Sequence, residues 1–129
     1  MEILKVPQEG NIIKLEIGME LSDDKKSVVG SVELDIESQS YFVDMVSMIF
    51  EEGLEPVNLI VDLKNVTYID SSGLWALFEG HKKANQKNGK MVLLSPTKDV
   101  RRVLDITKMS SKLQVFEEES AAIVSFNLS

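Results

Sequence analysis

The sequence of 129 residues contains no cysteine and only one histidine. Without cysteine the chain has no disulfides, no thiol nucleophiles and no thiolate metal ligands. One histidine is too few for a typical zinc site. We therefore expect no metal or other cofactor, and the absence of disulfides fits a reducing compartment.

Basic residues are scarce, with 14 Lys and Arg against 21 Asp and Glu, a net charge of -7. This balance disfavours nucleic-acid binding, because the phosphate backbone requires a basic footprint. It also argues against an anionic membrane surface. No apolar run approaches the roughly 18 residues of a membrane span, and residues 1–7 are too short and too charged for a signal peptide. We expect a cytoplasmic protein without a membrane span.

Catalytic motifs are also missing. The sequence has neither of the glycine-rich patterns that cradle phosphates or dinucleotides. A nucleophilic serine needs a base within hydrogen-bond reach. His81 follows Ser71 by ten residues on one predicted helix, about 15 Å along its axis, so it cannot activate Ser71 within one chain. Acidic pairs at residues 23–24 and 51–52 lie at predicted turns or helix ends, where solvated charge is usual. The sequence therefore predicts a protein that is not an enzyme.

The length and composition, with 43% hydrophobic and 27% charged residues, predict one globular domain, residues 1–129. Apolar patterns predict strands and helices that alternate after residue 56, which is typical of an α/β sheet with helical crossovers. The expected strands are 2–6, 11–17, 27–36, 59–63, 66–69, 90–95 and 113–116. The expected helices carry their apolar faces at 42–49, 74–81, 100–107 and 121–126.

The segment Asp70-Ser71-Ser72-Gly73 joins a predicted strand to a predicted helix. Asp70 is suited to accept hydrogen bonds from the free N–H groups of the first helical turn. Gly73 removes side-chain bulk and lets another backbone approach closely. The positive end of the helix dipole would also tolerate a phosphate on Ser71 or Ser72. A capping sequence without any regulatory role explains the same residues.

Four sequence segments resemble, in order and spacing, the STAS domain of bacterial anti-sigma factor antagonists. They are Leu59-Ile60-Val61-Asp62-Leu63, Tyr68-Ile69-Asp70-Ser71-Ser72-Gly73-Leu74, Asn88-Gly89-Lys90-Met91-Val92-Leu93 and Val100-Arg101-Arg102-Val103-Leu104. The resemblance covers about the last 70 residues. It implies an α/β fold with a mixed β-sheet and helices packed mainly on one face. Before the first helix the chain offers two Gly-x-x-Asp-like segments, 18–23 and 30–35, which predicts an extra N-terminal hairpin.

The resemblance implies a partner-switching protein. Family members bind an anti-sigma factor, usually also a serine protein kinase, and phosphorylation of the serine directly after the aspartate releases them. That serine is Ser71 here, and Ser72 stays open as an alternative acceptor. Asp70, Ser72, Gly73, Leu74 and Trp75 would form the switch loop and the partner-binding residues.

Several alternatives to this interpretation stay open. Trp75 fits a packed core residue as well as a partner anchor, and His81 fits a packed or half-exposed residue. Arg101 and Arg102 would pair with nearby acids, or would reach a phosphate if their turn lay beside the switch loop. As a whole, the chain could be a STAS scaffold of a signalling or lipid-transport complex that is never phosphorylated. A domain that senses a small ligand or nucleotide is the third possibility.

Overall fold

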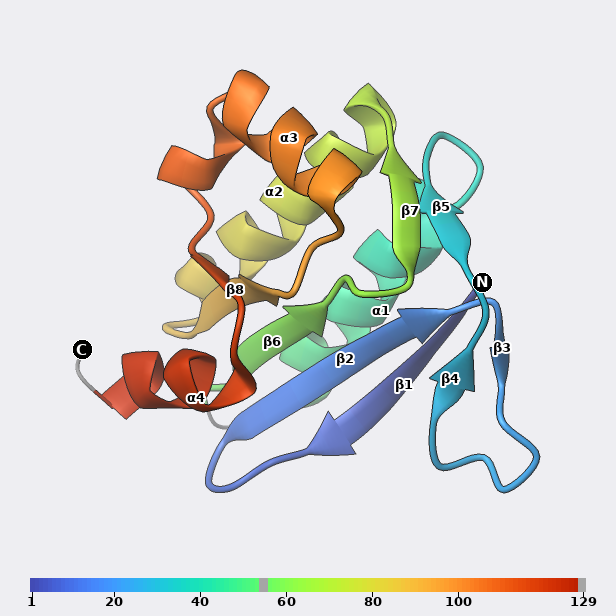
Figure 1. Ribbon diagram of the computed structural model, residues 1–129. Helices are drawn as coiled ribbons and strands as arrows, with labels where there is room; N and C mark the ends of the chain where they lie inside the picture. The colour runs from blue at the N-terminus through green and yellow to red at the C-terminus, as the bar shows by residue number, and fades with distance from the viewer. Residues whose placement is uncertain (54–55, 128–129) are drawn as a thin grey trace.

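The computed structural model describes residues 1–53 and 56–127 (Figure 1). The strands are β1 (Glu2–Pro7), β2 (Ile12–Gly18), β3 (Glu20–Leu21), β4 (Val28–Val29), β5 (Val32–Leu34), β6 (Asn58–Asp62), β7 (Val66–Ile69), β8 (Lys90–Leu94) and β9 (Val115–Phe116). The helices are α1 (Gln39–Glu52), α2 (Ser71–Gln86), α3 (Lys98–Ile106) and α4 (Glu119–Asn127), with a 3-10 turn, η1 (Met109–Ser111), after α3. No described helix is both long and apolar enough to cross a membrane.

The main sheet has five strands in the order β1-β2-β6-β8-β9. β1 pairs with β2 antiparallel, and the other neighbours pair in parallel. The predicted mixed sheet is therefore confirmed. Side chains of β6 alternate between its faces, with Leu59 and Val61 in one core cluster and Ile60 in the other. The dense apolar run of β6 thus reflects a strand that is covered on both sides.

Helices cover the two faces of this sheet unequally. Buried residues of α1, α2 and α3 share one large core cluster with the first face. α4 covers the second face, where Ala122 and Phe126 pack with residues of β2, β6 and β8, and Figure 1 shows it apart from the other helices. The prediction that helices lie mainly on one face is confirmed, and α4 is the exception.

The predicted strand at 27–36 is two strands with different partners. β4 forms an antiparallel hairpin with β3, whereas β5 pairs in parallel with β7. The break lies at Gly30, whose φ of 88° is in a region that favours glycine. A Cβ on Gly30 would also lie 2.9 Å from the Cβ of Met19. The hairpin predicted for the first third is thus β3–β4, and residues 30–35, rather than 18–23, lead into α1.

The buried face of α2 consists mainly of small residues. Its buried members are Gly73, Ala76, Leu77, Gly80 and Ala84. The helix predicted around 74–81 is present, but of those apolar positions only Leu77 is fully buried, and Leu74, Phe78 and His81 are half-buried. The reason for the small residues is close packing, because a Cβ on Gly80 would lie 2.9 Å from the sulfur of Met91 on β8.

Candidate functional site

The Asp70–Gly73 loop lies where β7 ends and α2 begins. Asp70 is the N-cap of α2, and its Oδ1 accepts a hydrogen bond from the Gly73 backbone N–H at 2.9 Å. The capping role predicted for Asp70 is therefore confirmed. Ser71 is the first residue of α2 and is exposed, whereas Ser72 is half-buried. Of the two serines, Ser71 is thus the more accessible to an enzyme.

Asp70 also ties this loop to the segment that follows β5. Its Oδ2 accepts from the Ile36 N–H at 3.3 Å, and its own N–H donates to the Leu34 carbonyl at 3.3 Å. The strands β5 and β7 are parallel, with Leu34 opposite Ile69. Their carboxyl ends therefore meet at one edge, as Figure 1 shows, and this brings residues 35–38 beside the start of α2.

Gly73 is buried against the end of β5. A Cβ at this position would collide with the Leu34 carbonyl oxygen and with the Ile69 side chain. The predicted close approach of another backbone is therefore confirmed, and that backbone is Leu34. Leu74 is partly buried and packs against the main core cluster. Gly73 and Leu74 thus face the protein interior and support the loop rather than form its exposed surface.

Two apolar side chains are exposed near Ser71. Trp75 is 50% exposed and belongs to neither core cluster, so its interpretation as a packed core residue was wrong. It follows Ser71 by four residues and therefore lies on the same face of α2. Ile36 is 68% exposed, beside Asp70. Sequence reasoning missed Ile36 because it placed this residue in a strand, although an isoleucine between Asp35 and Glu37 was a usable signal.

The loop before α1 is shaped by a second aspartate. Asp35 Oδ1 accepts from the N–H groups of Glu37 at 3.0 Å and Ser38 at 3.2 Å. The Ser38 hydroxyl in turn accepts from the Asp35 N–H at 3.0 Å and donates to the Glu33 carbonyl at 2.9 Å. These bonds fix the backbone of the turn that carries Ile36 at the surface.

The other predicted residues lie elsewhere. Arg101 forms ion pairs with Glu117 at 2.7 Å and with Asp105 at 3.7 Å, which confirms for this residue the predicted pairing with nearby acids. His81 is half-buried, with its Nε2 3.2 Å from the Asn85 side-chain nitrogen. Its Nδ1 is buried and has no hydrogen-bond partner within the described part of the chain. Within that same part, no group of three or more His, Cys, Asp or Glu residues could hold a metal ion.

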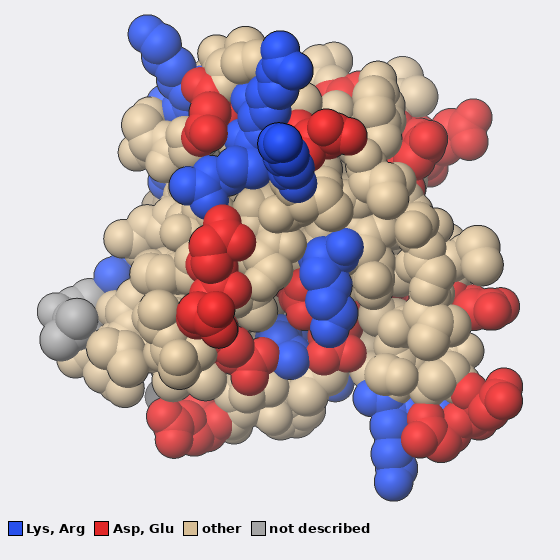
Figure 2. All heavy atoms as spheres, in the orientation of Figure 1, with Lys and Arg blue, Asp and Glu red and all other residues tan. Residues whose placement is uncertain are grey.

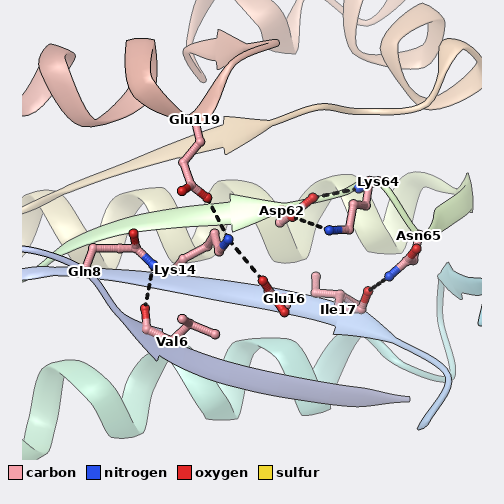
Figure 3. A network of polar contacts seen from close by, with 9 residues as sticks. All are labelled: Val6, Gln8, Lys14, Glu16, Ile17, Asp62, Lys64, Asn65 and Glu119. Carbon is pink, nitrogen blue, oxygen red and sulfur yellow. Dashed lines mark hydrogen bonds and ion pairs between the residues drawn. The ribbon is translucent and has the colours of Figure 1, made fainter. Parts of the chain in front are cut away.

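A polar network lies on the face of the sheet that α4 covers (Figure 3). Lys14 on β2 forms ion pairs with Glu16 at 3.0 Å and with Glu119 of α4 at 2.6 Å. Burial alone would lower the pKa of Lys14, but the hydrogen bonds and negative charges of Glu119 and Glu16 outweigh burial and raise it. Nearby, the buried Asp62 pairs with Lys64 at 3.5 Å. This network joins α4 to the sheet.

Comparison with known proteins identifies the family of this chain. Residues 27–122 match the family model of the STAS domain. The chain belongs to the STAS domain family. The family match begins at the end of the polar turn of the β3–β4 hairpin and includes every residue of the Asp70–Gly73 loop. It extends well before the segment on which the sequence resemblance was based.

Relatives of this STAS domain include known antagonists. It is 30% identical over 95 residues to the anti-sigma F factor antagonist of Paenibacillus polymyxa, covering 71% of this chain and 81% of the relative. It is 33% identical over 96 residues to the anti-sigma-B factor antagonist of Staphylococcus epidermidis, covering 74% and 86%.

The solved structures of SpoIIAA share this fold. The unphosphorylated anti-sigma factor antagonist SpoIIAA has a TM-score of 0.69 at 16% identity, covering 94% of this chain and 93% of its own. Phosphorylated SpoIIAA of Bacillus has a TM-score of 0.64 at 15% identity, covering 96% and 99%. At these identities the likeness concerns the fold.

Proposed function

We propose that this protein is an anti-sigma factor antagonist that binds an anti-sigma factor with serine kinase activity and is released when Ser71 is phosphorylated. The observation that carries the proposal is an exposed serine at the first residue of α2, directly after the capping Asp70. The named functions of the two curated relatives support it. The chain would act in the cytoplasm as ligand and kinase substrate, not as an enzyme.

The start of α2 is chemically suited to this modification. The kinase would transfer the γ-phosphoryl group of ATP to the Ser71 oxygen, with ADP leaving and the hydroxyl proton passing to a base of the kinase. The phosphoserine would add about -1.5 to -2 charges at neutral pH. The helix dipole and the free N–H groups of the first turn stabilise such a charge, so the domain can remain folded in both states.

Exposed apolar residues beside Ser71 explain how a phosphate would end binding. Trp75 is a residue type that often dominates the energetics of protein interfaces, and Ile36 adds exposed apolar area beside Asp70. A partner that covers them would also cover Ser71. Burying a phosphate dianion in such a contact costs free energy unless the partner supplies positive charge. Phosphorylation would therefore weaken the complex without unfolding either protein.

The test is a pull-down from a lysate of the source cell, with partners identified by mass spectrometry. Wild type should recover an anti-sigma factor with an ATP-binding kinase domain. Ser71→Asp should recover at least about tenfold less of this partner, which corresponds to a loss of ~1.4 kcal/mol in binding free energy. The control is Ser120→Asp, because Ser120 is exposed in the first turn of α4 and should tolerate aspartate. Equal recovery by wild type and Ser71→Asp would make the domain a constitutive scaffold.

Incubation of the recovered kinase with ATP separates the two serines. Wild type and Ser72→Ala should accept phosphate, and Ser71→Ala should not, as phosphopeptide mass spectrometry would show. Phosphate on Ser72 in both wild type and Ser71→Ala would move the switch to the half-buried serine and contradict the assignment of Ser71.

A further inference from the structure

Helix α1 carries apolar side chains on two faces. Its buried face consists of Phe42, Val46, Ile49 and Phe50. A second set, Tyr41, Met45 and Met48, follows the spacing i, i+4 and i+7 and therefore lies along one side of the helix. Tyr41 is 40% exposed and Met48 is 51% exposed, while Met45 is partly buried and also packs against the main core cluster. A surface helix normally has one apolar stripe, so this second stripe needs an explanation.

The second stripe borders a shallow groove that faces away from α2. Ser47 and Glu51 line the seam between α1 and α2 together with Lys83, which places the stripe on the other flank of α1. One hollow of about 470 Å³ is lined by Ser40, Tyr41, Asp44, Met45 and Met48. A second hollow of about 670 Å³ continues from Tyr41 to β5, β7 and Met1. We call the two together the α1 groove.

The charged side chains that line the α1 groove all have the same sign. Glu33, Asp35, Glu37 and Asp44 line it, and no Lys, Arg or His is among its lining residues. The sequence has no basic residue at all between Lys26 and Lys64. Lys98, Arg101 and Arg102 lie instead on α3, where Figure 2 shows positive side chains gathered. The groove is therefore complementary to a positively charged ligand.

We propose that the α1 groove binds a basic amphipathic helix of a partner protein. Apolar side chains of that helix would pack on Tyr41, Met45 and Met48, as amphipathic helices do in hydrophobic grooves. Methionine suits this role because its flexible thioether adapts to varied shapes. Lysines and arginines flanking its apolar face would pair with Asp44 and Glu37. A second copy of this chain is a poor occupant, since its net charge is -7 and its basic residues on α3 lie among Asp99 and Asp105.

This inference goes beyond the proposed function, since it concerns another helix and does not depend on phosphorylation. Ser71 and Trp75 belong to α2, and neither lines the α1 groove. The Ser71→Asp variant should therefore still bind a groove ligand through Tyr41, Met45 and Met48, because these contacts lie on α1. Failure of the switch at Ser71 would leave the groove proposal standing.

The probe is a synthetic leucine–lysine amphipathic helix of about 18 residues, or five turns. It is titrated into the full chain with 13C-labelled methionine methyl groups. The methyl signals of Met45 and Met48 should shift, and that of Met19 should not, although Met19 is 54% exposed on the β3–β4 side. A leucine–glutamate peptide of the same apolar pattern should cause no shift.

Two surface variants make the test specific. Met48→Ser and Asp44→Lys should each weaken the binding of the leucine–lysine peptide about tenfold, while Ile106→Ser, an exposed apolar residue of α3, should not. Circular dichroism shows whether each variant folds. Shifts of equal size at Met19, or wild-type affinity in both α1 variants, would overturn the proposal. So would a dimer of the chain alone that perturbs Met45 and Met48, because the groove would then belong to a second copy.

Discussion

At the scale of single residues, the site depends on contacts between two loops distant in sequence. Asp70 caps α2 with one oxygen and binds the Ile36 N–H with the other. Gly73 lets the Leu34 carbonyl approach the first turn of α2. Both residues therefore hold the exposed Ser71 and Ile36 in one arrangement, and neither needs to touch a partner.

Gly73→Ala should destabilise the protein by about 2 kcal/mol, within the usual range for overpacking a tight site. The added methyl group would collide with the Leu34 carbonyl oxygen and the Ile69 side chain, and backbone atoms cannot rotate away as a flexible side chain can. Urea denaturation followed by circular dichroism measures the change. The control, Ser71→Ala, alters an exposed residue and should stay within about 0.5 kcal/mol of wild type. Equal stability of both variants would contradict the close contact at Gly73.

At the scale of elements, α4 joins the sheet through one apolar and one charged contact. Ala122 and Phe126 pack on the second face of the sheet, and Glu119 pairs with Lys14 on β2. The side chain of Lys14 is 14% exposed and that of Glu119 is 39% exposed. Because Lys14 also pairs with Glu16, one ammonium group binds two carboxylates, one on β2 and one on α4.

The ammonium group of Lys14 should make the free energy of unfolding depend on pH in the alkaline range. The pKa of Lys14 is raised above its usual 10.5 in the folded protein. A raised pKa favours the folded state below the unfolded pKa, and the benefit is lost as pH rises through the folded value. The free energy of unfolding of wild type should thus exceed that of Lys14→Met below about pH 10.5, and the difference should shrink above it. Urea denaturation between pH 7 and 12 measures this.

Lys82→Met is the matched control, since Lys82 pairs with Glu79 at 3.4 Å on the surface of α2 and its side chain is 49% exposed. Its difference from wild type should be small and nearly constant with pH, because exposed ion pairs contribute little. Parallel pH curves for Lys14→Met and wild type would show that the Lys14 pairs do not stabilise the folded state.

At the scale of the whole molecule, the proposed switch changes a surface without changing the fold. Ser71 lies at a helix start, outside both core clusters. A negative charge at that position interacts favourably with the helix dipole, by about 0.3–1 kcal/mol. The expected consequence of modification is lost binding in a protein that remains folded.

Ser71→Asp should therefore keep its thermal midpoint within about 4 °C of wild type, the shift that ~1 kcal/mol produces in a domain of this size. Thermal denaturation followed by circular dichroism measures it, and Ser120→Asp serves as the same substitution on another helix. A much larger fall in the thermal midpoint of Ser71→Asp, without a similar fall in Ser120→Asp, would mean that Ser71→Asp fails to bind its partner because it unfolds. The pull-down would then have to be repeated with enzymatically phosphorylated wild type.

The sequence by itself determined the features that are local or periodic. The order of most strands and helices followed from apolar spacing, and the capping role of Asp70 followed from its place between a strand and a helix. The four segments that resemble the STAS family also identified the family correctly, with Ser71 after the aspartate. These features were predictable because each depends on residues within a few positions of one another.

Only the tertiary structure decided which residues meet across the fold. The parallel pairing of β5 with β7 brings Ile36 beside Asp70, although 34 residues separate them. The break at Gly30 lies where Met19 approaches closely, and the small residues of α2 leave room for Met91. The same holds for Trp75, since no local pattern states whether a tryptophan on a helix is covered. Burial is a property of the packed molecule, because it depends on what the rest of the chain places against each side chain.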